Sequence, residues 1–166
     1  FAGDLRSWEP QLRHFSRRYR CIAFNARGYS PSDVPEPVSK YSQAIAADDI
    51  ANVMRDLGVR KAHIIGCSMG GYATLHFGLR FPRLARSLTV IGAGYGSDPD
   101  KRAQFLRDTE TMARRFEELG TPEAISTYQI GPARVQLQNK DPRGFREFCE
   151  EFSGHSALGS ANTLRG

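Results

Sequence analysis

The sequence predicts an α/β fold, in which a parallel sheet is flanked by helices and followed by an all-helical segment. Three short apolar runs of strand length, residues 20–25, 60–65 and 86–91, alternate with segments of helical period. These runs do not alternate between apolar and polar residues, as is typical of parallel strands that are covered on both faces. No strand pattern returns after Pro99. We therefore expect a core over residues 1–99 and a separate helical segment over residues 100–166.

The helices of this predicted fold have recognisable starts and stops. Ser7 is the expected N-cap of the first helix, and Gly58 is placed to end the second as a C′ glycine. Phe81-Pro82 stops the third, because a residue before proline disfavours the helical conformation. The turn-rich residues 26–37 read as a loop. The expected helices span residues 7–17, 42–57, 69–80, 101–119, 124–128, 142–152 and 156–164.

Composition excludes several classes of partner. The chain has 166 residues and a net charge of +5, but its arginines are scattered, and the tightest group, residues 17–20, lies at an expected helix end. Cations there complement the helix dipole, so we expect no nucleic-acid partner. No apolar stretch approaches the roughly 20 residues of a membrane span, so none is expected.

The cysteines point to a reducing compartment. Cys21, Cys67 and Cys149 are widely spaced and odd in number, which is typical of a cytoplasmic protein rather than of a disulfide framework. No spacing of cysteines and histidines suggests a zinc site. We expect neither a metal nor an organic cofactor.

The motif Gly66-Cys67-Ser68-Met69-Gly70 lies between an expected strand and an expected helix. In this G-x-S-x-G pattern the central serine sits on a sharp, strained turn that exposes its hydroxyl, the property that a serine nucleophile needs. Ser68 is therefore the expected nucleophile, and the alternative is a tight strand-to-helix turn without chemistry. Cys67 is expected to be a small packing residue.

The neighbours of Ser68 have expected roles of their own. Gly66 and Gly70 leave room for the backbone to reverse, and Gly71 lets the helix pack close to the sheet. The N–H of Met69, at the start of the helix, is an expected donor to a developing oxyanion.

Three blocks of sequence resemble the lid-bearing α/β-hydrolase superfamily, which includes esterases, lactonases and C–C hydrolases. Residues 1–8 resemble the segment after the family's His-Gly oxyanion dipeptide. Residues 64–71, which contain the G-x-S-x-G motif, resemble the family's nucleophile elbow. Residues 24–33 resemble the D-x-R-G-x-G-x-S loop, with Asn25 and Ser30 as departures. The resemblance covers somewhat more than half of the chain.

The resemblance implies a partial α/β-hydrolase fold. A full core has eight strands, and the triad acid and histidine come after the seventh and eighth strands, so both are expected beyond Gly166. The chain is then an internal fragment without a complete triad. The second oxyanion N–H would be that of Phe1, or of Ala2, and the helices after Pro99 would begin the lid.

The implied activity is hydrolysis of a small-molecule carboxylic ester or related acyl bond through an acyl-enzyme. The serine argues against the dehalogenase and epoxide hydrolase relatives, which use aspartate at this position. Two alternatives stay open: acyl transfer on the same fold, and a ligand-binding module without catalysis. Neither the substrate nor the oligomeric state can be read from the sequence.

Several other side chains are weaker candidates. Asp98 comes after an expected strand and could be the triad acid, although it also suits a helix cap. Paired acidic residues at 48 and 49 suit the first turn of a helix and are expected to be structural. The four histidines, of which the last lies between two expected helices, are expected mainly to be packing residues: His14, His63, His76 and His155.

Overall fold

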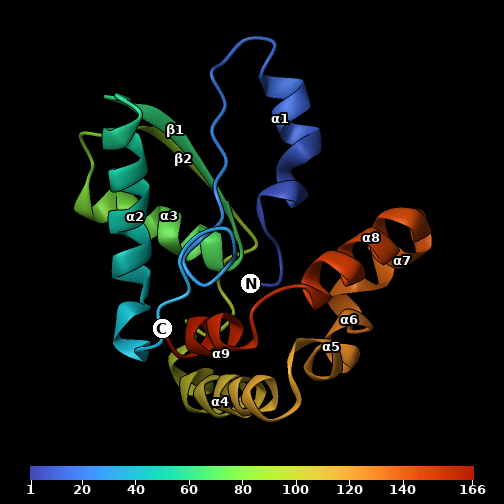
Figure 1. The fold of residues 1–166 in the computed structure, drawn as a ribbon. Helices are drawn as coiled ribbons and strands as arrows, with labels where there is room; N and C mark the ends of the chain where they lie inside the picture. Colours follow the sequence, from blue (N-terminus) through green and yellow to red (C-terminus); the bar gives the residue numbers. More distant parts are fainter. The chain divides into compact units, whose positions relative to one another are not determined.

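The computed structural model describes residues 1–166, except the side chain of Thr127 (Figure 1). The residues form two compact units, which are described separately. The first unit comprises Phe1, Pro37–Glu110 and Thr163–Gly166, and the second comprises Ala2–Glu36 and Thr111–Asn162.

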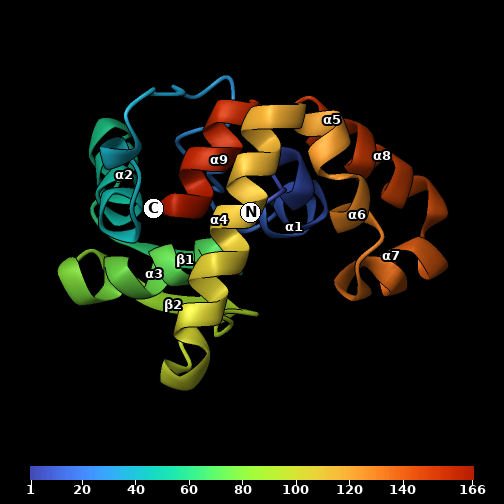
Figure 2. The ribbon, with the colours of Figure 1, turned by 90° about the horizontal axis from the view of Figure 1, so that it is seen from below.

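The first unit contains a parallel pair of strands joined by a helical crossover. Its elements are η2 (Val38–Lys40), α2 (Gln43–Asp56), β1 (Ala62–Cys67), α3 (Met69–Arg80), β2 (Ala85–Ile91), η3 (Pro99–Lys101) and the first part of α4 (Arg102–Leu119). The register pairs Ala62 with Ala85 and Cys67 with Ile91. Figure 2 shows α3 alongside the sheet, where it packs on both strands and on α2. The predicted class, a parallel sheet flanked by helices, is confirmed.

The core of this unit lies between α2, α3 and the sheet. Ala47, Met54 and Phe77 are buried there, and partly buried Ile50 and Ile64 pack against them. The predicted ends of α2 are confirmed: the hydroxyl of Ser42 accepts the N–H of Ile45 at 3.1 Å. Gly58 comes after the helix with φ +66°, a conformation that favours glycine.

The second unit is helical and built around an aromatic core. Its elements are η1 (Leu5–Trp8), α1 (Glu9–Phe15), the last part of α4, α5 (Thr121–Ala124), α6 (Ser126–Gln129), η4 (Pro132–Arg134), α7 (Val135–Lys140), α8 (Pro142–Ser153) and most of α9 (Ala157–Arg165). The ring of Phe152 is fully buried and lies 6.3 Å from that of Phe116 and 5.9 Å from that of Phe148. The predicted helical character after Pro99 is confirmed, while the expected division near residue 100 stays a prediction.

The strand predicted at residues 20–25 is wrong. In the part of the chain that the structure describes, strands are assigned only at β1 and β2, because a strand exists through its ladder to a neighbour. The apolar side chains of Ile22 and Phe24 are each 39% exposed. Asn25 is tied to the loop after it instead, since the hydroxyl of Ser32 donates to its carbonyl at 2.6 Å.

The start of the first helix also differs from the prediction. Ser7 lies inside η1, and the cap is Asp4, whose carboxylate accepts the N–H of Arg6 at 2.9 Å. An Asp cap three residues upstream satisfies the first free N–H groups, so the chain turns earlier than expected. The α-helix itself ends at Phe15.

The described residues lack two kinds of feature. They contain no helix that is both long enough and apolar enough to cross a membrane. They also contain no cluster of three or more His, Cys, Asp or Glu side chains arranged to hold a metal ion.

Candidate active site

Ser68 occupies a strained turn between β1 and α3. Its backbone has φ +53° and ψ −115°, and in the described chain it shares positive φ among non-glycine residues only with Ala2. Such conformations cost of order 1–3 kcal/mol and persist where the surrounding structure holds them. The Ser68 N–H donates to the carbonyl of Ile91 at 2.7 Å, so the end of β2 holds the turn. The serine is exposed at the N-terminus of a 12-residue helix.

The glycines of the elbow differ in how closely they are approached. A Cβ on Gly66 would lie 2.0 Å from the carbonyl oxygen of Gly70 and 2.4 Å from the hydroxyl of Thr74. A Cβ on Gly71 would lie 2.9 Å from the side chain of Ala93, at the end of the sheet. A Cβ on Gly70 would meet no atom within 4 Å, so this glycine matters through its carbonyl, which accepts the Thr74 hydroxyl at 2.8 Å.

The two expected oxyanion donors lie at chain positions with special geometry. Met69 is the first residue of α3, where backbone N–H groups lack intrahelical acceptors and the dipole favours negative charge. Phe1 precedes Ala2, which has φ +69° and is 1% exposed. Sequence reasoning missed this left-handed alanine, because nothing in its type or its neighbours signals the conformation. The roles of Met69 and Phe1 stay predictions.

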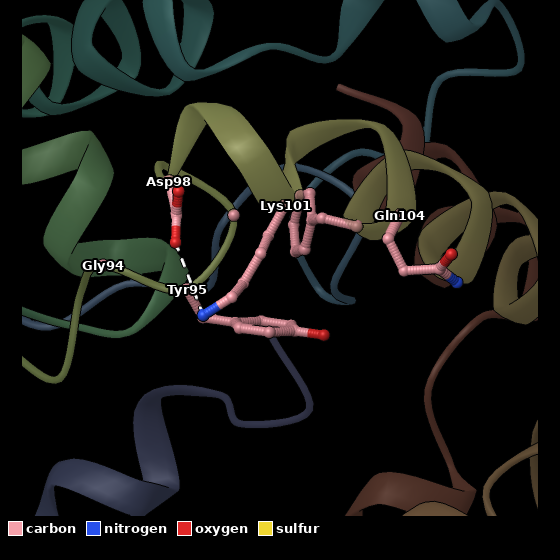
Figure 3. Close-up of a pocket in the computed structure, with 7 residues that line it drawn as sticks. Gly94, Tyr95, Asp98, Lys101 and Gln104 are labelled. Atoms are coloured by element: carbon pink, nitrogen blue, oxygen red, sulfur yellow. Dashed lines mark ion pairs between the residues drawn. The ribbon is translucent and has the colours of Figure 1, made fainter.

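Asp98 behaves as a helix cap in the structure. Its carboxylate accepts the N–H of Asp100 at 3.0 Å and lies 3.4 Å from the ammonium of Lys101. It lines a cavity of about 320 Å³ together with Tyr95, Lys101, Gln104 and Phe105 (Figure 3). These contacts account for its position as a cap, and its role as a triad acid stays a prediction.

The loop that lines this cavity is hydrogen-bonded to α3, the helix that begins after Ser68. The hydroxyl of Tyr72, in the first turn of α3, donates to the carbonyl of Tyr95 at 3.1 Å. Gly96 has φ +91°, and a Cβ there would lie 2.8 Å from the ring of Phe105. The loop after β2 is therefore shaped by a glycine and tied to α3.

Three of the four histidines have ordinary surroundings. His63 lies near the start of β1, the opposite end from Ser68, and its Nδ1 is 2.7 Å from the hydroxyl of Ser87. His76 lies within α3, and His14 is exposed on α1 with its ring against Phe15. None of the three is placed by these contacts as a base for Ser68.

Two further candidates also have plain environments. Asp48 lies in the second turn of α2 and not in the first, so its expected place at the start of the helix is wrong. Its carboxylate pairs instead with Arg80 of α3 at 2.7 Å across a half-exposed surface. Cys67 is the last residue of β1 and is exposed rather than packed, because alternate residues of this strand face away from α3.

His155 differs from the other histidines, because its ring is buried and paired. Its Nε2 lies 3.1 Å from Oδ2 of Asp4, and the two side chains are 5% and 3% exposed. The guanidinium of Arg6 also donates to Asp4 and lies 3.5 Å from Glu151. No sequence signal could reveal this pair, since its members are 151 positions apart.

The environment of Asp4 strongly favours its ionised form. Burial by itself raises the pKa of this carboxyl, but hydrogen bonds from Arg6 and His155 outweigh burial and lower the pKa from 3.8 to about 2. Glu151 shows the opposite balance, since burial raises its pKa more than Arg6 lowers it. Asp4 is therefore a permanent anion over the physiological pH range.

Comparison with known proteins identifies the family of this chain. The family model described as the alpha/beta hydrolase fold matches residues 1–140. The chain belongs to the α/β-hydrolase family. The superfamily expected from the elbow and its flanking blocks is thus confirmed.

The relatives are hydrolases of several kinds. A Caulobacter vibrioides protein named as a putative carbamate hydrolase, RutD, is 34% identical over 114 residues, which cover 65% of this chain and 42% of the relative. Epoxide hydrolase 1 of Caenorhabditis elegans is 37% identical over 82 residues, or 49% of this chain and 20% of that one. The chain thus spans less than half of the length of these curated relatives.

A likeness in structure extends over nearly the whole chain. A thermophilic esterase from Thermogutta terrifontis superposes with a TM-score of 0.86 and 21% identity, covering 98% of this chain and 58% of the esterase. At this level of identity the likeness shows the fold alone.

Proposed function

We propose that the intact protein hydrolyses carboxylic esters or related acyl bonds through an acyl-serine intermediate on Ser68. The observation that carries this proposal is the backbone of Ser68, a non-glycine residue with φ +53° at the turn from β1 into α3. The strain lifts an exposed hydroxyl to the N-terminus of a helix, the arrangement that a serine nucleophile requires. A structural turn without chemistry would be served better by glycine.

The proposed reaction has two halves. In the first, Oγ of Ser68 bonds to the acyl carbon, its proton passes to a base, and the carbonyl electron pair moves onto oxygen. The N–H groups of Met69 and Phe1 stabilise this oxyanion, which collapses and expels the alcohol with the transferred proton. In the second half, water attacks the acyl carbon, and Ser68 regains its proton as the acid leaves.

The base is expected to be a histidine outside the four in this chain. His63 is hydrogen-bonded to Ser87 at the far end of β1, and a strand of six residues separates it from Ser68 by roughly 16–20 Å. His76 lies two turns along α3. In members of the family the base and its acid follow later strands of the core, and we expect the same order in the intact protein.

The bond that is cleaved is assigned from the nucleophile rather than from the relatives' names. Those names include a carbamate hydrolase and epoxide hydrolases. Ser68 stands where epoxide-opening members of the superfamily are expected to carry aspartate. A serine suits attack on an acyl carbon, and the carbonyl of a carbamate falls within the same class of bond.

The test is labelling of the intact protein with a fluorophosphonate, in which a bond forms between Oγ and phosphorus as fluoride leaves. We expect labelling at Ser68, hydrolysis of p-nitrophenyl acetate, and loss of both in Ser68→Ala by a factor of about 10³ or more. Labelling that survives in Ser68→Ala contradicts the assignment. Release of the acyl group onto an added alcohol in preference to water identifies acyl transfer instead.

Two matched controls separate Ser68 from its neighbours. Cys67→Ala removes the adjacent exposed thiol, and Ser97→Ala removes another exposed hydroxyl of the same unit, which is hydrogen-bonded to the carbonyl of Gly94 at 2.6 Å. Both variants are expected to keep labelling and turnover. Loss of labelling in Cys67→Ala alone would make the thiol the nucleophile.

A further inference from the structure

The cavity beside Asp98 lies wholly within the first unit, the unit that also contains Ser68. The loop after β2, the short helix η3 and the first turn of α4 contribute all of its lining residues. Its volume of about 320 Å³ is in the range of sites that bind small molecules, and it is large enough for a phenyl ring. The cavity is therefore a candidate for part of a substrate.

Two hydrogen-bonded links hold this cavity near the nucleophile. The N–H of Ser68 donates to the carbonyl of Ile91 at 2.7 Å, and Gly94, the first lining residue, follows Ile91 by three positions, a span of at most about 11 Å. The N–H of Tyr72 donates to the carbonyl of Ser68 at 3.2 Å, while its hydroxyl donates to the carbonyl of Tyr95 at 3.1 Å. A small ester that reacts at Ser68 is therefore long enough to extend toward the cavity.

The aromatic walls of the cavity are fixed before any ligand binds. The rings of Tyr95 and Phe105 meet edge-on with their centres 5.2 Å apart. The guanidinium of Arg102 lies over the ring of Phe105 at 5.5 Å and donates to the carbonyl of Gly96 at 3.0 Å. The backbone of Gly96 is so close to Phe105 that a Cβ would lie 2.8 Å from the ring. A site that is already formed binds without the entropic cost of ordering its walls.

The polar side chains of the lining have partners of their own. The carboxylate of Asp98 lies 3.4 Å from the ammonium of Lys101, and Figure 3 shows the two side chains pointing toward one another. The amide of Gln104 donates to Asp108 at 2.6 Å and accepts from Arg107 at 2.6 Å. The lining thus carries one cation and one anion, and an anionic ligand near Lys101 would also face Asp98. This balance of charge favours a neutral ligand.

We propose that the cavity receives a neutral aryl group of the ester that Ser68 attacks, with Tyr95 and Phe105 as specificity-determining residues. We call it the aryl site. The inference rests on the proposed function and narrows its substrate class. A phenyl ring in the cavity packs against both aromatic walls, an arrangement that aromatic rings prefer, and buries apolar surface. The aryl group belongs to either the acyl or the alcohol part of the ester, since the two walls recognise both alike.

The experiment measures kcat/KM of the intact protein for two pairs of esters. p-Nitrophenyl phenylacetate and p-nitrophenyl acetate share a leaving group and differ in the acyl part, whereas benzyl acetate and ethyl acetate differ in the alcohol part. We expect Phe105→Ala and Tyr95→Ala to lower the ratio of aryl to non-aryl kcat/KM about tenfold in one of the two pairs. The pair that responds identifies which part of the ester occupies the aryl site.

Leu106→Ala is the matched control for the wall variants. Leu106 is the neighbour of Phe105 on α4 and is 51% exposed, but it does not line the cavity. We expect it to keep both ratios within about twofold of the wild type, as ordinary surface substitutions do. Tyr95 is 73% exposed, so Tyr95→Ala tests the aryl site even where Phe105→Ala fails to fold. Tm is measured for every variant.

The charge of the ligand is tested with the ester of the pair that responds. A carboxylate at the para position of its aryl ring should lower kcat/KM of the wild type, because the ionised group resists burial and faces Asp98. Equal or faster turnover of the carboxylated ester overturns a neutral aryl ligand.

The outcomes separate the aryl site from the proposed function. Turnover by the wild type, with both ratios unchanged in Phe105→Ala and Tyr95→Ala, overturns the aryl site alone. If the wild type neither turns over an ester nor is labelled at Ser68, the proposed function falls, and binding of phenylacetamide, measured by calorimetry, decides the aryl site by itself. Binding that weakens about tenfold in Tyr95→Ala and is kept in Leu106→Ala supports it. Absence of binding, or equal weakening in both variants, overturns it.

Discussion

The elbow around Ser68 and the cluster around Asp4 are both tightly built, but by different means. The elbow is held by backbone atoms close in sequence, through the approach of Gly66 to the Gly70 carbonyl and the bond from the Ser68 N–H to Ile91. The Asp4 cluster is held by charged and aromatic side chains that meet from positions 151 residues apart. The geometry of the elbow is thus set by nearby stretches of the chain, whereas that of the Asp4 cluster depends on how the helical unit packs.

The two regions also differ in electrostatics. Ser68 is exposed and depends on the helix dipole and on strain, neither of which titrates near neutral pH. Asp4 is 3% exposed and ionised, and it remains so because Arg6 and His155 donate to it. Acid is therefore expected to act on the second region first.

The largest losses of stability should come from substituting glycines at which a Cβ would clash with a carbonyl oxygen. The added Cβ would lie 2.0 Å from the Gly70 oxygen in Gly66→Ala, and 2.0 Å from the Gly28 oxygen in Gly159→Ala. Because backbone cannot yield as a side chain can, each variant should lose about 3 kcal/mol of unfolding free energy, measured by urea titration.

Each of these variants has a control in its own region. Gly70→Ala meets no atom within 4 Å, and Gly154→Ala meets its nearest atom at 3.5 Å, so both should change stability by less than about 1 kcal/mol. If Gly66→Ala proves as mild as Gly70→Ala, the elbow is not held by close backbone approach, and the contrast between the regions fails.

An intermediate effect is expected from acid, through Asp4. Its pKa is lowered from 3.8 to about 2, so its contribution is complete above pH 3.8 and is lost as the pH falls toward 2. The wild-type protein should lose about 2 kcal/mol between about pH 5 and pH 2 that Asp4→Asn does not lose, as measured by urea unfolding at each pH.

A surface carboxylate serves as the comparison for Asp4. Asp48 pairs with Arg80 at 2.7 Å, but the two side chains are 42% and 44% exposed, so the pair is screened by solvent. Asp48→Asn should leave the acid profile close to that of the wild type. Equal profiles for Asp4→Asn and the wild type would show that burial and pairing do not set the acid response of the second unit.

The smallest effect should come from the side-chain hydrogen bond inside the elbow. Thr74→Val keeps the shape of a 1% exposed side chain but removes the hydroxyl that donates to the Gly70 carbonyl at 2.8 Å. The expected loss of unfolding free energy is no more than about 1 kcal/mol, because the Gly70 carbonyl remains part of α3 when the Thr74 hydroxyl is removed. Thr74→Ser retains the hydroxyl and therefore tests the methyl group separately. A loss of unfolding free energy in Thr74→Val as large as that in Gly66→Ala would contradict an elbow that is held by its backbone.

The parts of the fold that were predictable are those with local causes. The helix α2 is bounded by a serine cap and a C′ glycine, and both act within a few residues. The strand expected at residues 20–25 failed, because an apolar run becomes a strand only when a neighbour completes its ladder. The cap at Asp4 was missed for a similar reason, since its preference over Ser7 depends on Arg6 and on distant partners.

The family, the parallel arrangement of β1 and β2, and the turn on which Ser68 lies were all predictable from the order of residues. These depend on hydrophobic period, glycine spacing and the order of strand and helix, which short stretches of chain encode. By contrast, the burial of His155 against Asp4 and the left-handed conformation of Ala2 became visible only in the folded chain. Contacts across 151 positions arise from packing of the helical unit, and no local pattern of residues carries that information.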